Sequence, residues 1–161
     1  MHTWLVGVCD QLQNIRLVVW MVTARYAYPF IQWTHFTGLS LWLGTTLALD
    51  FRLLGAGRRF QTAAELSDAL FRWNWIGLGI ALLGGFTLFA TAAVGYIDNP
   101  AFRLKVGVLL PLALAWHIFV QRKSRTWGRT PETPSVAKLA GLMEITLWVS
   151  VATAAVWIPN Y

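Results

Sequence analysis

The chain has 161 residues, of which 57% are hydrophobic and only 12% are charged. Soluble domains ordinarily carry about 25% charged residues, so this composition excludes an ordinary soluble enzyme and predicts an integral membrane protein. The formal net charge of +6 does not indicate nucleic-acid binding, because the basic residues lie between apolar runs, where membrane topology explains them.

The first segment, residues 3–22, has the pattern of an amphipathic helix. Trp4, Val8 and Leu12 recur at helical spacing, and polar residues such as Asp10 lie on the opposite face. We expect this helix to lie in the membrane interface; a helix that binds a partner protein is the rival interpretation. The segment lacks the basic start and uninterrupted apolar stretch of a cleavable signal peptide.

Four apolar runs follow, and a hydrocarbon core of about 30 Å requires about 20 such residues in a helix. A spanning backbone must satisfy its own hydrogen bonds, so these runs are helices rather than strands. We therefore predict an all-α protein, an integral membrane four-helix bundle that forms a single domain over residues 1–161. The expected transmembrane helices cover about 29–53, 71–97, 100–122 and 135–158.

Local signals mark where several of these helices begin. Thr62 and Glu65 have the spacing of a capping box before the second span. Asn99-Pro100 and Thr133-Pro134 each predict a cap followed by a first-turn proline. Pro111 lies inside the third span and should kink it, because proline cannot donate a backbone hydrogen bond.

The distribution of Lys and Arg predicts the orientation. The first and third loops hold nine of these residues, whereas the N-terminal segment and the second loop hold four. The excess predicts that the first and third loops are cytoplasmic, so that both termini are periplasmic in a bacterial inner membrane. The nine are Arg52, Arg58, Arg59, Arg72, Arg122, Lys123, Arg125, Arg129 and Lys138; the four are Arg16, Arg25, Arg103 and Lys105.

Three ionisable residues, His35, His117 and Glu144, lie inside the predicted spans, where such groups are costly and often functional. Two histidines on different helices suggest a b-type haem. However, His35 lies toward the outer side and His117 toward the inner side, about 13 Å apart along the membrane normal. Two axial nitrogens of one haem are only about 4 Å apart, which counts against a haem shared by both histidines.

Two other pairings join residues that lie at a similar depth in the membrane. Glu144 and Met143 lie at about the level of His117, so a His117–Glu144 hydrogen bond is favoured over a His117–Met143 pair of haem ligands. Three roles stay possible for His35: a haem ligand, a copper ligand, or an interfacial histidine whose hydrogen bonds are satisfied. Asp50 and Arg52, at the end of the first span, are expected to form ion pairs with other helices.

The stretch from Tyr28 to Leu39 (YPFIQWTHFTGL) and the stretch from Leu49 to Gly55 (LDFRLLG) resemble a bacterial family of small four-helix membrane proteins of unknown function, the DUF6644-type family. Further matches lie at 75–77, 85–89 and 96–105, so the likeness spans most of the chain. A more remote likeness, in architecture and one histidine, is to the membrane domains of CopD-type copper-resistance proteins and small b-type cytochromes. That resemblance implies a ligand role for His35.

These observations lead to three functional hypotheses. The first is a haem b subunit that transfers electrons to a periplasmic or membrane partner. The second is a non-catalytic accessory subunit of a larger membrane complex, and the third is a copper-handling protein with its metal at His35. The chain contains no Walker loop, GxGxxG, GxSxG or HExxH motif, so no catalytic activity of its own is expected.

Overall fold

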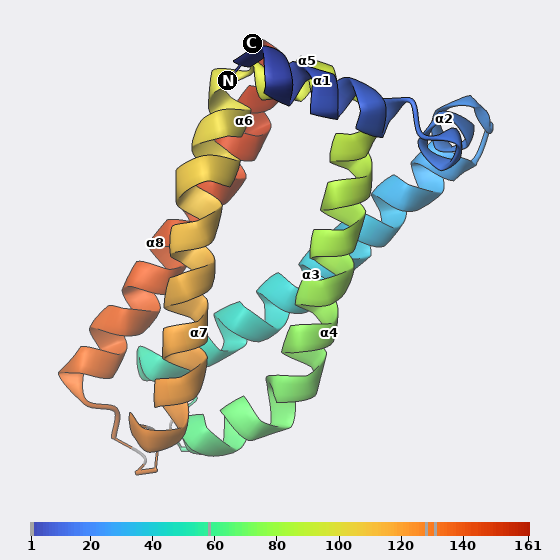
Figure 1. Ribbon diagram of the computed structural model, residues 1–161. Helices are drawn as coiled ribbons and strands as arrows, with labels where there is room; N and C mark the ends of the chain where they lie inside the picture. The colour runs from blue at the N-terminus through green and yellow to red at the C-terminus, as the bar shows by residue number, and fades with distance from the viewer. Residues whose placement is uncertain (1, 58, 128, 131) are drawn as a thin grey trace.

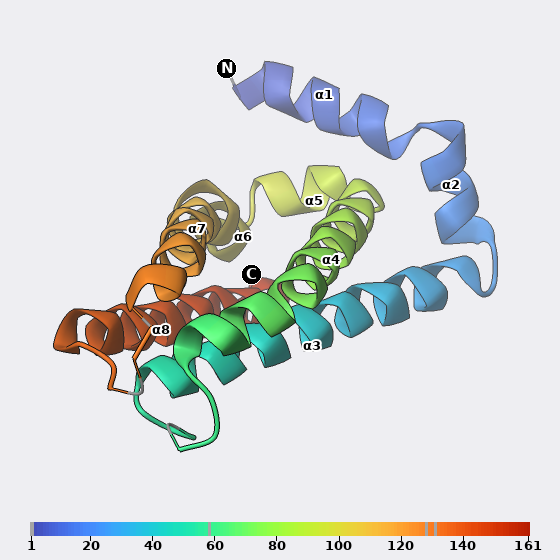
Figure 2. The ribbon, with the colours of Figure 1, turned by 90° about the horizontal axis from the view of Figure 1, so that it is seen from below.

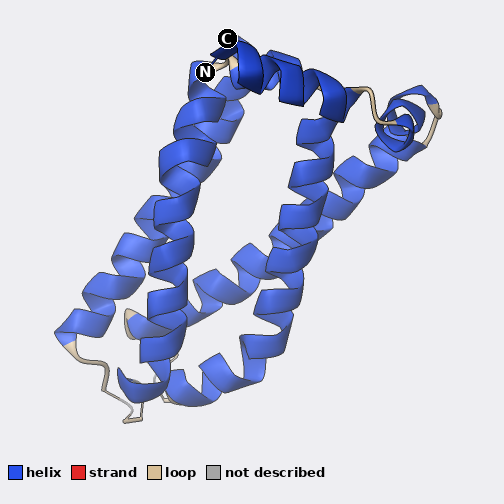
Figure 3. Ribbon diagram, in the orientation of Figure 1, coloured by secondary structure: helices blue, strands red, loops and turns tan. Residues whose placement is uncertain are grey.

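The computed structural model describes residues 2–57, 59–127, 129–130 and 132–161, and all its regular structure over these residues is helical (Figure 3). Arg58, one of the nine basic residues used to predict orientation, lies outside the described residues. The absence of strands follows from long apolar runs that can satisfy their hydrogen bonds only within a helix when surrounded by lipid.

The N-terminal segment folds as two helices rather than the single amphipathic helix expected over residues 3–22. Helix α1 (His2–Gln13) ends where the side chain of Asn14 bonds back to Asp10, and α2 (Arg16–Thr23) begins after the extended residue Ile15. Helix α1 lies across one end of the long helices and packs against α5 (Ala93–Ile97) (Figure 1). Gln13 fixes this contact by accepting a hydrogen bond from the backbone of Val94 at 3.2 Å.

Helices α3 (Ala27–Leu53) and α4 (Ala63–Ala90) form the most extensively packed pair. They approach so closely because glycines face the neighbouring backbone: a Cβ on Gly77 would lie 2.7 Å from the backbone nitrogen of Trp42, and one on Gly84 would lie 2.9 Å from Cα of His35. Small residues are used in this way where membrane helices pack without a hydrophobic driving force.

The turn between these two helices follows rules visible in the sequence. Gly55 adopts a positive φ of 109°, and the amide of Ala56 bonds to the carbonyl of Phe51, which ends α3 in a Schellman motif. The predicted capping box is present at the start of α4, where Thr62 and Glu65 bond reciprocally. Helix α4 therefore begins well before the apolar run that it carries into the core.

The third long segment is continuous from Pro100 to Trp127 and contains α6 (Pro100–Leu104), a π-helical turn η1 (Lys105–Leu109) and α7 (Leu110–Trp127). Asn99 caps it by accepting from the amide of Phe102, as predicted. Pro111 is accommodated by the wider π turn directly before it, since the amide of Leu110 bonds to the carbonyl of Lys105 five residues back.

The last long helix, α8 (Ser135–Trp157), continues into a short 3₁₀ turn, η2 (Ile158–Asn160). Its cap differs from the prediction: Pro134 is itself the N-cap residue, and the hydroxyl of Thr133 accepts a hydrogen bond from Arg52 instead. Helices α7 and α8 pack side by side, and both contact the α3–α4 pair near one end of the molecule (Figures 1 and 2). The chain termini lie at the opposite end (Figure 1).

Three segments of the described chain are long and apolar enough to cross a membrane: Ala63–Ala90, Pro100–Trp127 and Ser135–Asn160. Apolar side chains cover much of their outward surface, including Leu83 on α4, Val108 on η1 and Val149 on α8. A surface of this kind belongs in lipid, because a soluble protein rarely exposes apolar patches of such extent. Helix α3 is of similar length but does not reach the same hydropathy.

Candidate functional site

Four polar side chains from four helices meet in the core of the helix assembly. His117 of α7 lies at the centre, with its Nδ1 2.5 Å from Oε1 of Glu144 on α8 and its Nε2 2.9 Å from Oδ1 of Asn74 on α4. The amide nitrogen of Asn74 lies 2.9 Å from the hydroxyl of Thr46 on α3. All four residues are buried, so this polar chain connects the helices away from solvent and lipid.

A neighbouring threonine determines the direction of these hydrogen bonds. The hydroxyl of Thr45 donates to the carbonyls of Leu41 and Trp42, so its oxygen can only accept from Nδ2 of Asn74, which lies 3.0 Å away. The carbonyl oxygen of Asn74 must then face His117. Because that oxygen is an acceptor, Nε2 of His117 carries a proton and donates it.

Three tryptophans enclose the imidazole of His117. The ring centroids of Trp42, Trp75 and Trp148 lie 5.8, 5.7 and 6.3 Å from that of His117, and all three rings meet it edge to face. Such a wall excludes water, and low local polarity strengthens the hydrogen bonds inside it. The same low polarity makes any unpaired polar atom in this region expensive.

Asp50 completes the cluster from the end of α3. Its side chain interacts with that of Glu144 and is fully buried. Gly141 permits this approach, since a Cβ there would lie 3.3 Å from the carbonyl oxygen of Asp50. The ion pair expected for Asp50 is therefore wrong: its neighbour is another carboxyl group. Arg52 points elsewhere, donating to the carbonyl of Gln61 and to Thr133.

His35 lies apart from this cluster, in the N-terminal half of α3. Its Nδ1 is 2.7 Å from the carbonyl oxygen of Ala81 on α4, and a Cβ on Gly85 would lie 3.1 Å from its ring carbon Cε1. Trp42, which contacts His117, is seven residues further along α3, so the two histidines are separated by about 10 Å along this helix. The structure thus places His35 and His117 at different levels.

The structure brings some of the residues that the sequence suggests as partners or ligands together and keeps others apart. His117 and Glu144, which the sequence suggests as a polar pair, are hydrogen-bonded. Met143 is 41% exposed on the outer face of α8, whereas His117 is fully buried, so the two do not meet as a pair of ligands. Within the described residues, no group of three or more His, Cys, Asp or Glu side chains could hold a metal ion.

Sequence reasoning missed Asn74 because it considered only ionisable groups inside the spans. The signal was present: Asn74 is a lone carboxamide near the start of a long apolar run, where burial forces it to find partners. The tryptophans around His117 could not be assigned, since ten tryptophans are spread over the chain and only packing selects three of them.

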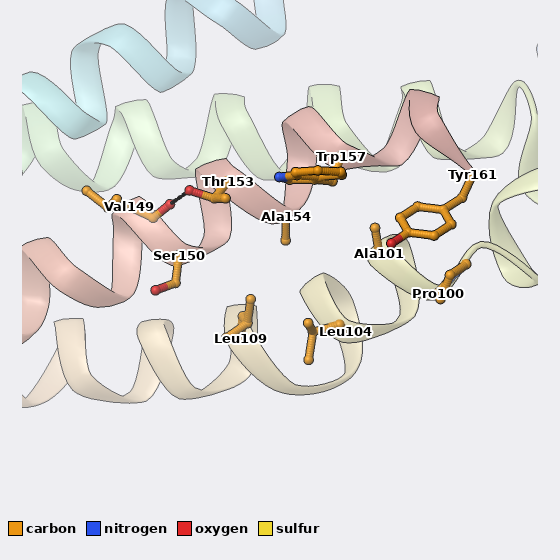
Figure 4. Close-up of a pocket in the computed structure, with 10 residues that line it drawn as sticks. All are labelled: Pro100, Ala101, Leu104, Leu109, Val149, Ser150, Thr153, Ala154, Trp157 and Tyr161. Carbon is orange, nitrogen blue, oxygen red and sulfur yellow. Dashed lines mark hydrogen bonds between the residues drawn. The ribbon is translucent and has the colours of Figure 1, made fainter.

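A groove of about 430 Å³ lies between α6 and α8 near the end of the molecule where the chain termini lie (Figures 1 and 4). Leu104 and Leu109 form one wall, and Trp157 and Tyr161 lie on the other side. The hydroxyl groups of Ser150 and Thr153 each donate to a carbonyl of their own helix at 2.8 Å. The groove therefore offers apolar contact and little polar recognition.

Comparison with known proteins gives a family without a known activity. A model described as a family of unknown function, DUF6644, matches residues 18–160. No curated protein and no solved structure matches the chain. The match covers α2 through α8 and so includes the His117 cluster and His35. The chain therefore belongs to the DUF6644 family, whose function is unknown.

Proposed function

We propose that this chain is a small multi-pass subunit of the bacterial inner membrane that binds b-type haem through His35 and transfers electrons to a membrane or periplasmic partner. The observation that carries the proposal is the fixed ring of His35. Its Nδ1 faces a backbone carbonyl, and a carbonyl oxygen can only accept, so Nδ1 holds the proton. The neutral ring then keeps its lone pair on Nε2, the atom that would bind iron.

This arrangement is the usual one for a metal-binding histidine, in which the second ring nitrogen is held by a carbonyl or carboxylate. Nε2 of His35 makes no hydrogen bond with any residue that the structure describes. Gly85 leaves space beside the ring, since a Cβ at this position would lie 3.1 Å from Cε1 of His35. These features support a ligand role more strongly than that of a satisfied interfacial histidine.

The residues present would offer haem one protein ligand rather than two. Both nitrogens of His117 are engaged, by Glu144 and Asn74, and Met143 lies on the outer face of α8. Of the three candidate ligands, His35 alone would therefore hold the iron. When bound, haem would supply one-electron redox chemistry, and the protein would provide its orientation and apolar surroundings.

The proposed topology has four spans with both termini in the periplasm. Helix α3 has 27 residues and is about 40 Å long, enough to cross the membrane beside the three more apolar segments. Both termini lie at the same end of the long helices, as an even number of crossings requires (Figure 1). The excess of basic residues in the first and third loops favours the cytoplasm for the opposite end.

A second candidate is a non-catalytic accessory subunit of a larger membrane complex. The observation that favours it is the pair of helices α1 and α2, which project large apolar side chains outward: Trp4 and Trp20 are 68% and 57% exposed. Such side chains suit either the membrane interface or a partner protein. Copper at His35 has less support, because among the described residues this histidine belongs to no group of three or more His, Cys, Asp or Glu side chains that could hold a metal ion.

The test is the absorption spectrum of protein purified from cells with ample haem. We expect a Soret band of a haem with one protein ligand, lost in a His35→Ala variant. Thr37→Ala is the matched control, because Thr37 lies on the same helix and its hydroxyl bonds only to its own helix, at the carbonyl of Trp33. A wild-type protein without a Soret band would overturn the haem proposal. A partner that co-purifies in mild detergent would then favour the accessory subunit.

A further inference from the structure

The cluster around His117 contains buried carboxyl oxygens that lack the donors they require. Neither carboxyl oxygen of Asp50 accepts a hydrogen bond from any described residue, and Oε2 of Glu144 accepts none from these residues either. Asp50 is 0% exposed and Glu144 1% exposed, so water does not replace these donors at the surface. Buried polar atoms are nearly always paired, and such exceptions call for a chemical explanation.

The explanation follows from what an ionised carboxylate can do. A carboxylate only accepts hydrogen bonds, so two facing carboxylates repel each other and neither stabilises the other. One added proton turns the repulsion into a hydrogen bond, because a protonated carboxyl group donates through its O–H. The side chains of Asp50 and Glu144 interact with each other, and among the described residues the basic group that contacts this pair is His117.

We propose that Asp50, Glu144 and His117 form a proton-binding site that holds two exchangeable protons, one shared by the two carboxyl groups and one shared by Glu144 and Nδ1 of His117. The second of these positions is the 2.5 Å contact between His117 and Glu144. Two carboxylates and a neutral imidazole carry two negative charges in total, and the two bound protons neutralise them. The cluster is then neutral overall, as its burial requires.

Protons can enter or leave the hydrogen-bond chain at one of its ends but not at the other. A proton that moves from His117 to Glu144 leaves Nδ1 with its lone pair and gives Glu144 an O–H bond, with no change in total charge. At the other side of the ring, Nε2 donates to the amide oxygen of Asn74, which does not exchange protons. The chain therefore ends at Asn74, and protons enter or leave through Asp50, near the end of α3.

No other charged group among the described residues faces the site. Helix α4 contributes Asn74, α7 contributes His117 and α8 contributes Glu144. From α3, Asp50 faces the site, whereas Arg52 donates to Gln61 and Thr133. An apolar cluster containing Leu49, Leu53, Ala137 and Ala140 packs around the end of α3. The site consequently binds protons from the side of the first loop, and exchange requires movement of this apolar cover.

Infrared spectroscopy of the full chain in lipid nanodiscs tests the proposal. At neutral pH we expect the C=O band of a protonated carboxylic acid, shifted in D₂O. The band should disappear in Asp50→Asn, whose amide replaces the proposed O–H donor to Glu144. Asp68→Asn is the matched control, because Asp68 is 65% exposed and lies 2.9 Å from Arg125. The band should remain in this control.

A measurement on the wild-type protein covers the case in which Asp50→Asn does not fold. Carboxyl-¹³C labelling of aspartate should shift the acid band, whereas the same labelling of glutamate should leave it in place. Absence of an acid band at neutral pH would overturn the proposal. A band that shifts only with labelled glutamate would overturn the assignment of the proton to Asp50. The site is independent of haem at His35, so either proposal can fail alone.

Discussion

His117 and Glu144 are 27 positions apart in the chain, yet Nδ1 of one lies 2.5 Å from Oε1 of the other in the buried core. The contact joins α7 to α8, and Asn74 extends it to α4 through the second nitrogen of the same ring. Burying a pair of this kind costs free energy. Removing one partner also costs free energy, because the other partner is then buried without compensation. This asymmetry leads to the first prediction.

His117→Leu should destabilise the protein by about 3 kcal/mol or more, because Glu144 would then face Asp50 with no base beside it. The double variant His117→Leu/Glu144→Leu should lose less than the sum of the two single variants. The measurement is a double-mutant cycle of reversible unfolding in mixed micelles. Additive effects would show that the two side chains do not interact.

The close approach of α3 and α4 predicts opposite effects for two glycines of one helix. Gly84→Ala should destabilise by about 1–3 kcal/mol, because the new methyl group would lie 2.9 Å from Cα of His35. Gly79→Ala is the matched control: no atom lies within 4 Å, so alanine should be neutral or stabilise by up to about 1 kcal/mol. Unfolding of both variants checks the difference, and equal effects would contradict the packing.

Gly85→Ala should disturb the ring of His35 more than the fold. The added Cβ would lie 3.1 Å from Cε1 of the imidazole, close enough to push the ring aside. If His35 holds haem, the ratio of haem to protein should fall several-fold while the melting temperature changes little. Gly79→Ala again serves as the control. Unchanged haem content in Gly85→Ala would count against ligation by His35.

The capping box at the start of α4 predicts a cost of about 1 kcal/mol for Thr62→Ala, since the amide of Glu65 would lose its acceptor. Hydrogen exchange should also become faster at Glu65 and Leu66, the first amides of the helix. Thr146→Ala is the control, because that hydroxyl bonds only to the carbonyl of Leu142 in its own helix. Similar losses in both variants would indicate that the cap contributes nothing.

Reporter fusions check the proposed orientation. Alkaline phosphatase fused after Tyr161 should be active, because the enzyme folds only in the periplasm, and a fusion in the loop after α3 should be inactive. The physical reason is the excess of Lys and Arg in the first and third loops. The inverse pattern would place both termini in the cytoplasm and the proton-binding site near the periplasmic side.

The sequence by itself determined the helical class and the approximate positions of the long helices, but not the division of the N-terminal segment into α1 and α2. Apolar runs free of charge require helices in lipid, and short-range rules located the Thr62–Glu65 box and the Asn99 cap because these interactions involve residues only three positions apart. It also suggested the pairing of His117 with Glu144, since both are at similar depth and each needs a partner. Family membership followed from the same kind of local signal, namely the motifs around Tyr28 and Asp50.

Only the tertiary structure decided which polar groups share a site. Depth along the membrane normal can be counted from the sequence, but the rotation of each helix about its axis depends on packing, which here follows from glycines such as Gly77 and Gly84. That rotation brings Asn74 to His117 and turns Met143 outward. It also places Asp50 against Glu144 rather than against a base, a contact between like groups that a charge-pairing rule would not predict.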